Sequence, residues 1–183
     1  ETHSMSMEYF VWKYIEKFFG QDALKYKYMH ALENFSFIPY GTMVDAFQHI
    51  VYEKPDMTPA ERNQAWLELE KTFRPHIQTE GIPFIEEGRR WQYQMHIYES
   101  PFYYIDYCLA QAVALQFWAM IQDNREGAWK TYLDYTRLGG SMVFTDLLES
   151  AGLRSPFDPE CLKDVAAKVK AYLDGVDMAE IDK

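Results

Sequence analysis

Helical periodicity runs through almost all of this 183-residue chain and limits its fold more than any other feature. Apolar side chains recur every three or four residues, as on the buried face of a helix. This pattern predicts helices over residues 1–19, 22–34, about 42–52 and 59–73, and a long one after residue 100. No segment shows the alternation of apolar and polar residues that is typical of a strand. We therefore predict an all-α, multi-helix domain.

The boundary signals of the fourth predicted helix are the clearest in the chain. Thr58 has the position of an N-cap, Pro59 that of the first helical residue, and Glu61 that of the partner in a capping box. Pro75 cannot continue a helix and predicts its end. Gly20 predicts the end of the first helix in the same way, as a residue that tolerates a left-handed backbone.

The second half of the chain begins with a long connection and returns to helices. Residues 75–100 contain glycines and prolines without periodicity, and a connection of this length is often functional. Ser100 as N-cap and Pro101 as the first helical residue predict the start of a strong helix. Two or three more helices follow, broken at Gly139-Gly140 and at the stretch "SPFDPE".

The charge balance excludes two classes of partner. The net charge is −10, and no cluster of basic residues is longer than the pair Arg89-Arg90. Nucleic acid and anionic membranes attract basic surfaces, so we expect neither as a partner. These two arginines are solvated in one interpretation. In the other, one of them holds a peptide carboxylate beside a cleft.

Cysteine content and the start of the chain predict the compartment. Cys108 and Cys161 are the only cysteines, and one lies in a helical apolar run, which favours free thiols in a reducing environment. The chain shows no signal peptide, and its longest apolar stretch is too short to span a bilayer. We therefore expect a cytoplasmic protein.

The opening stretch "ETHSMSMEYF" places two carboxylates on an apolar stripe. Glu1 and Glu8 share one helical face with Met5, Trp12 and other apolar residues, so we expect that face to be buried. A buried carboxylate is costly unless something pairs with it. One interpretation is a helix-dipole role for Glu1 and a lysine partner for Glu8. The other is a metal ion, although none of the five histidines belongs to an H-E-x-x-H pair.

The stretch "HIYESPFYYIDY" gathers a histidine and several tyrosines around the predicted start of a helix. His96 comes just before that start, and Tyr103, Tyr104 and Tyr107 lie within the first two turns. Their hydroxyl groups could donate hydrogen bonds to a developing oxyanion. The alternative is an aromatic core cluster whose hydroxyl groups reach water. Asp106 could orient a tyrosine or be exposed.

A third set of residues carries a weaker signal. Asp45, His49 and Glu53 follow one another at intervals of four, which would align metal ligands on one helical face. That face is opposite the apolar one, where a solvated charge stripe belongs. We therefore expect these residues, and His3, to be solvent-exposed.

Together, the opening decapeptide, the stretch "HIYESPFYYIDY" and the tail with "LGGS" and "LLESAGL" resemble the oligoendopeptidase F and Pz-peptidase type of metallopeptidase. These enzymes are relatives of thimet oligopeptidase and neurolysin. The resemblance covers essentially all 183 residues, and it is most specific in the first two stretches. It implies a mostly helical enzyme whose deep channel admits only short peptides.

The resemblance also implies roles for particular residues. In the family, two histidines of an H-E-x-x-H helix and a glutamate on a later helix hold a zinc ion. By position, Glu1 is that glutamate, and Glu8 is a carboxylate that supports the site. His96 and the tyrosines Tyr103, Tyr104 and Tyr107 would contact the substrate and stabilise the tetrahedral intermediate, and the spacing leaves open which two tyrosines act.

The H-E-x-x-H motif, with two zinc ligands and the general base, is missing from this sequence. We therefore expect residues 1–183 to be the C-terminal helical part of the catalytic domain, beginning at the third ligand. Its partners would be the upstream segment of the same protein and short peptide substrates, and the chain alone would be inactive. The alternative is a non-catalytic helical module that binds a peptide or protein and needs no metal.

Overall fold

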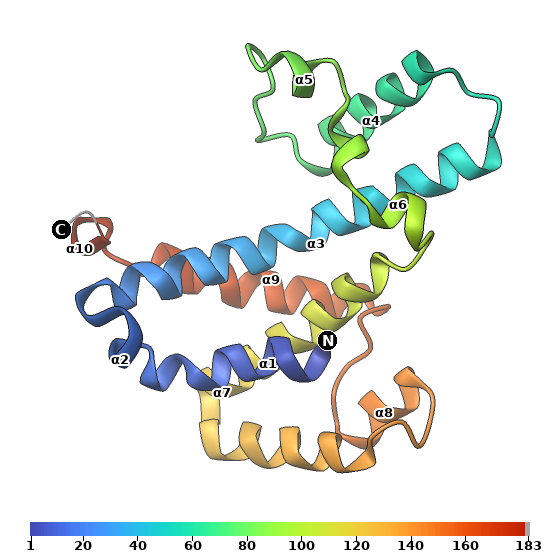
Figure 1. Cartoon of the computed structure of the whole chain (residues 1–183). Helices are drawn as coiled ribbons and strands as arrows, with labels where there is room; N and C mark the ends of the chain where they lie inside the picture. Colours follow the sequence, from blue (N-terminus) through green and yellow to red (C-terminus); the bar gives the residue numbers. More distant parts are fainter. Residues whose placement is uncertain (182–183) are drawn as a thin grey trace. The chain divides into compact units, whose positions relative to one another are not determined.

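A computed structural model describes residues 1–181, and all regular structure in that range is helical (Figure 1). The prediction of an all-α fold is confirmed. The α-helices are α1 (Thr2–Phe10), α2 (Glu16–Phe19), α3 (Ala23–Glu53), α4 (Pro59–Phe73), α5 (Pro83–Glu86), α6 (His96–Glu99), α7 (Ile105–Leu138), α8 (Phe144–Ser150), α9 (Pro159–Asp174) and α10 (Met178–Ile181). Short 3₁₀ helices cover Val11–Tyr14, Gly20–Asp22 and Arg90–Tyr93.

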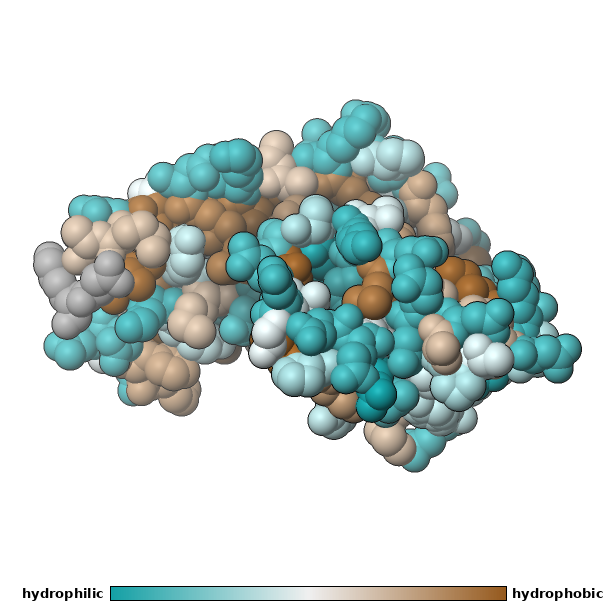
Figure 2. All heavy atoms as spheres, turned by 90° about the horizontal axis from the view of Figure 1, so that it is seen from above, coloured by the Kyte–Doolittle hydropathy of each residue, from teal (hydrophilic) through white to brown (hydrophobic). Residues whose placement is uncertain are grey.

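The chain divides into two compact units, each with its own apolar core. Unit 1 comprises Glu1–Phe35 and Leu109–Lys183, and unit 2 comprises Ser36–Cys108. Helix α3 and helix α7, which is kinked at Asn124 (φ −156°, ψ 95°), each contribute residues to both units. Among the described residues, no helix is both long enough and apolar enough to cross a membrane. The face seen in Figure 2 is largely hydrophilic, with smaller apolar areas between the polar side chains.

The core of unit 1 is rich in aromatic rings from α1 and α7. The ring of Phe10 lies 5.2 Å from that of Tyr132, measured between centroids, and 6.2 Å from that of Phe117. Helix α9 joins through Tyr172, whose ring lies 5.6 Å from that of Trp118. The buried residues of this core are Phe10, Val113, Phe117, Ala128, Tyr132, Tyr135, Leu147, Leu148 and Leu153.

Unit 2 is built on α3 and α4. Phe47 of α3 meets Trp66 of α4 edge-on at 5.2 Å, and both side chains are fully buried. The indole N–H of Trp66 donates to the Glu70 carboxylate at 2.9 Å, and the Arg74 guanidinium donates to the other oxygen at 2.8 Å. The only charge inside this core is thereby paired, as a buried carboxylate requires.

The boundary predictions for α4 are confirmed. The hydroxyl of Thr58 accepts from the Glu61 backbone N–H, and the Glu61 carboxylate accepts from the Thr58 backbone N–H at 2.7 Å. The helix starts at Pro59 and ends at Phe73, just before Pro75. Similarly, α7 ends at Leu138, and Gly139 follows it with φ +53°.

Two helix boundaries in unit 2 differ from the prediction. Helix α3 continues through Pro39, where two helices were expected, although a proline inside a helix costs roughly 3 kcal/mol. Helix α7 starts at Ile105 instead of just after Ser100, because Phe102 has a left-handed backbone with φ +62°. The Phe102 N–H donates at 2.7 Å to the buried side chain of Gln48, which compensates part of that strain.

The opening segment also differs from the single helix predicted over residues 1–19. Helix α1 gives way to a 3₁₀ turn at Val11 and then to α2, and Gly20 ends the segment with φ +53°. The buried side of α1 carries Thr2, Ser6, Tyr9 and Phe10. The prediction that Glu1 and Glu8 lie on the buried face is therefore wrong: both are exposed.

Candidate functional site

The structure brings the histidine and the tyrosines of the "HIYESPFYYIDY" stretch together within unit 2. The ring of His96, the first residue of α6, lies 4.8 Å from that of Tyr104 and 5.9 Å from that of Tyr107. Tyr103 meets Tyr107 edge-on at 5.4 Å. We call His96, Tyr103, Tyr104 and Tyr107 the tyrosine cluster. The short helix α6 and the turn before α7 fold the segment back, so residues eight and eleven positions apart meet.

The two tyrosines that contact His96 have the i, i+3 spacing left open by the sequence. Tyr104 is half-buried, and burial raises the pKa of its hydroxyl to about 12. It therefore stays protonated at neutral pH and can act as a hydrogen-bond donor. Tyr103 is more exposed, at 47%. Of the three tyrosines, Tyr104 and Tyr107 are the ones whose rings contact that of His96.

Two polar side chains that the sequence did not single out, those of Gln94 and Tyr40, connect to His96. The amide nitrogen of Gln94 lies 2.8 Å from Nδ1 of His96, and the Tyr40 hydroxyl donates to Oε1 of the same glutamine at 2.9 Å. The guanidinium groups of Arg74 and Arg90 lie over the ring of Tyr40. Gln94 stands two residues before His96, but Tyr40 is 54 residues from Gln94. No local sequence signal could have paired them.

Glu1 belongs to unit 1, at the start of α1. Its carboxylate is exposed and accepts a hydrogen bond from the Ser4 hydroxyl at 2.6 Å, which restricts its orientation. Within residues 1–181, no group of three or more His, Cys, Asp or Glu side chains is arranged to hold a metal ion. One oriented carboxylate fits a single ligand of a zinc site, but it does not make a site by itself.

Glu8 pairs with a histidine of unit 1, where a lysine was one expectation. Its carboxylate lies 2.8 Å from Nε2 of His30, and the indole N–H of Trp12 donates to Nδ1 of the same ring at 3.2 Å. Because Nδ1 accepts, the proton of the neutral imidazole is on Nε2 and is donated to Glu8. This contact joins α1 to α3. It explains the carboxylate on this helix without a metal ion.

Most of the remaining candidate residues lie in solvated positions. His49 is exposed, and its Nε2 lies 3.4 Å from the Asp45 carboxylate in an i, i+4 pair. His49 and Glu53 are exposed, as expected, but the prediction is wrong for Asp45, whose side chain is only 19% exposed. Arg89 is exposed and forms an ion pair with Glu87 at 2.5 Å. His3 is exposed, as expected, and stacks on Tyr135 at 5.1 Å. Cys108 and Cys161 are both free thiols, which confirms that expectation.

Comparison with solved structures gives high similarity over almost the whole chain. An oligoendopeptidase F is 49% identical with a TM-score of 0.91, and a Pz peptidase A solved with an inhibitor is 46% identical with the same TM-score. An oligoendopeptidase F from Bacillus anthracis is 43% identical with a TM-score of 0.80. Each match covers 96% of this chain.

These relatives are much longer than this chain, which spans 31%, 31% and 28% of their lengths. No curated protein sequence matches the chain. The family model of peptidase family M3 matches residues 1–167, which is most of the sequence. With this match, and with solved relatives at 43–49% identity, the resemblance seen in the sequence is confirmed: the chain belongs to peptidase family M3.

Proposed function

We propose that this chain is the C-terminal helical part of a zinc-dependent peptidase that hydrolyses short oligopeptides. The observation that carries the proposal is the tyrosine cluster: His96 in ring contact with Tyr104 and Tyr107. These are donor groups of the kind that stabilise the oxyanion formed in peptide hydrolysis. Membership of family M3 and the similarity to an oligoendopeptidase F and a Pz peptidase support the same reaction.

Glu1 would be one ligand of the zinc ion. The hydrogen bond from Ser4 orients its carboxylate, a constraint typical of metal-binding carboxylates. When bound, zinc supplies Lewis-acid polarisation of the scissile carbonyl and lowers the pKa of a bound water. The two histidine ligands and the general base would come from an H-E-x-x-H segment, which this sequence does not contain. Alone, this chain would be inactive.

Glu8 would support the zinc site without binding the metal itself. Its contact with His30 ties α1 to α3 within unit 1 and so holds the helix that begins at Glu1. His96, Tyr104 and Tyr107 would donate hydrogen bonds to the substrate carbonyl as negative charge develops on its oxygen. Tyr103 would contact the peptide from the edge of the tyrosine cluster.

We also propose a deep substrate channel in the intact enzyme and a cytoplasmic location. A deep channel in the intact enzyme would restrict substrates to short, unfolded peptides. Two free thiols and the lack of a basic cluster favour the cytoplasm and short peptides over nucleic acid or membrane partners.

The test is peptide hydrolysis by the full-length protein that carries this chain. A quenched fluorescent octapeptide should be cleaved, a chelator should abolish cleavage, and added zinc should restore it. Glu1→Gln should lower the zinc content measured by elemental mass spectrometry, whereas Glu16→Gln, an exposed glutamate of α2, should retain one zinc per chain. Peptide binding without cleavage and without zinc would instead support a non-catalytic binding module.

A further inference from the structure

The surroundings of His96 contain a series of contacts that begins with two arginines over the ring of Tyr40 and continues in hydrogen bonds. Arg74 and Arg90 place their guanidinium carbons 5.1 and 5.5 Å from the centre of the Tyr40 ring. Arg74 is also paired with Glu70, so this group of three side chains keeps a net positive charge. Positive charge over a phenol ring draws electron density from the hydroxyl oxygen. The Tyr40 hydroxyl donates a hydrogen bond to the side chain of Gln94.

The Tyr40 hydroxyl in turn selects the orientation of the Gln94 amide. An amide side chain presents an acceptor on one end and donors on the other, and its orientation follows from its hydrogen-bond partners. Because Tyr40 donates, at 2.9 Å, its partner on Gln94 is the carbonyl oxygen Oε1. The amide nitrogen then faces His96.

The amide nitrogen determines which nitrogen of His96 carries the proton. Nε2 of Gln94 lies 2.8 Å from Nδ1 of His96, and an amide NH₂ group can only donate. Nδ1 must therefore accept, and the proton of the neutral imidazole resides on Nε2. We infer that Gln94 is a positioning residue that holds His96 as the Nε2–H tautomer, with its N–H directed away from Gln94 and available to a substrate oxygen.

This inference rests on the proposed function for the role of His96, but the tautomer itself can be measured without any activity. A histidine that donates to an oxyanion must carry its proton on the nitrogen that faces the substrate. The opposite tautomer would present a lone pair there and repel the developing negative charge. Arg74, Arg90, Tyr40 and Gln94 together would set this choice before substrate binds.

The experiment is a long-range ¹H–¹⁵N correlation of the histidine rings in the 183-residue chain at pH 9, above the ordinary imidazole pKa of about 6.5. His96 should show the Nε2–H pattern. Gln94→Glu keeps the size of the side chain but replaces the donor by an acceptor, so His96 should change to the Nδ1–H pattern. Gln92→Leu, at an exposed position two residues earlier, should leave the pattern unchanged. The other histidine signals report on the fold of each variant.

An Nδ1–H pattern in the unmutated chain, or an Nε2–H pattern retained in Gln94→Glu, would overturn the inference. If Gln94→Glu does not fold, the unmutated chain alone decides. In the full-length peptidase, Gln94→Glu should lower kcat by about tenfold or more and change KM by less than about threefold. An unchanged kcat with the altered tautomer would refute the positioning role. Absence of any peptidase activity would refute only the proposed function.

Discussion

At the scale of single residues, the chemistry proposed for this chain depends on hydroxyl groups that keep their protons. Burial, the largest cause, raises the pKa of Tyr104 to about 12, so its hydroxyl remains protonated at neutral pH and can donate a hydrogen bond. The neighbouring ring of Tyr107, 5.5 Å away, and that of His96 hold it in place. A donor that is fixed before the reaction loses no energy in reorganising during it.

Removing one hydroxyl from the tyrosine cluster should lower turnover with little effect on the fold. In the full-length peptidase, Tyr104→Phe and Tyr107→Phe should each lower kcat by about 10²–10³-fold, the usual cost of losing one oxyanion donor, and change KM much less. Steady-state hydrolysis of a fluorogenic peptide measures both constants. Tyr93→Phe, which removes a hydroxyl from an exposed tyrosine, is the control. Rates within about threefold of the unmutated enzyme would exclude a catalytic role.

At the scale of elements, close approach of two helical segments in unit 2 depends on a glycine. Gly41, inside α3, has no side chain, and an added Cβ would lie 2.2 Å from Sγ of Cys108 at the start of α7. The sulfur also contacts the Ile38 carbonyl at 3.7 Å. Cys108 therefore packs against α3 on both sides of Pro39, at Ile38 and at Gly41.

Gly41→Ala should destabilise the chain by about 1–3 kcal/mol, because the added methyl group overlaps the sulfur atom. In a Cys108→Ala background the same change should be neutral or stabilising by up to about 1 kcal/mol, since alanine is the better helix former. Urea denaturation of the four proteins of this double-mutant cycle measures the coupling. A Gly41→Ala effect that is equal in the two backgrounds would show that the sulfur is not the obstacle.

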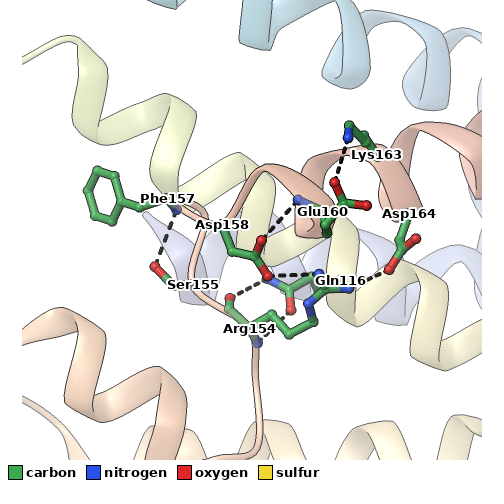
Figure 3. Close-up of polar contacts among 8 residues, drawn as sticks. All are labelled: Gln116, Arg154, Ser155, Phe157, Asp158, Glu160, Lys163 and Asp164. Carbon is green, nitrogen blue, oxygen red and sulfur yellow. Dashed lines mark hydrogen bonds and ion pairs between the residues drawn. The ribbon is translucent and has the colours of Figure 1, made fainter.

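A second element-scale contact holds the linker before α9 against α7 in unit 1. The Gln116 side chain accepts from the Arg154 backbone N–H and donates to its carbonyl, each at 2.9 Å (Figure 3). The Arg154 side chain forms ion pairs with Asp158 and Asp164 (Figure 3). These three charged side chains are 43–67% exposed, and exposed ion pairs add only about 0–1 kcal/mol. The two hydrogen bonds of Gln116 therefore hold the linker more strongly than the ion pairs of Arg154 do.

Gln116→Leu should lower the free energy of unfolding by about 1–2 kcal/mol, because two hydrogen bonds are lost together. Gln122→Leu, also on α7 and exposed, should change it by less than about 0.5 kcal/mol. Thermal or urea denaturation followed by circular dichroism measures both values. Equal effects at the two positions would contradict the anchoring role of Gln116.

At the scale of the whole molecule, buried weak acids make the fold sensitive to alkali. Burial, again the largest cause, raises the pKa of the Cys108 thiol to about 12, from an ordinary value of 9.0. The pKa of Tyr9 is also raised by burial. Between pH 9 and 12 the unfolded chain releases protons that the folded chain retains, so stability falls as the pH rises through this range.

The free energy of unfolding should therefore be lower at pH 10.5 than at pH 8, and the loss should be smaller in Cys108→Ala. Comparing the two pH values within each protein removes the effect of the side-chain deletion itself. Urea titrations followed by far-ultraviolet circular dichroism at both pH values measure the difference. If Cys108→Ala loses as much stability as the unmutated chain, the buried thiol is not a source of the alkaline sensitivity.

Local signals in the sequence were sufficient to predict much of the architecture. The capping box of Thr58 and Glu61 determines where α4 begins, because its hydrogen bonds lie within four residues of one another. Helical periodicity determined the all-α class, and the free state of both cysteines was also predicted. The family could be recognised because two short stretches, the opening decapeptide and "HIYESPFYYIDY", are specific to it.

Contacts between distant residues decided what these signals could not. The late start of α7 accompanies the hydrogen bond from the Phe102 N–H to Gln48, which is 54 residues away in the chain. Helix α3 likewise runs through Pro39 against local propensity. The stripe predicted for Glu1 and Glu8 fails within α1 itself, because the helix buries the side that carries Thr2, Ser6, Tyr9 and Phe10. The 3₁₀ turn at Val11 then rotates only the residues that follow both glutamates.

By itself, the sequence thus determined the helical class, the family and the segment that carries His96, since each depends on short-range patterns. Only the tertiary structure decided that Tyr40 and Gln94 connect to that histidine and that Glu8 meets His30. Glu8 and His30 are 22 residues apart in the chain, and Tyr40 and Gln94 are 54 residues apart. Their geometry exists only after the helices pack, because no local preference specifies a contact over that separation.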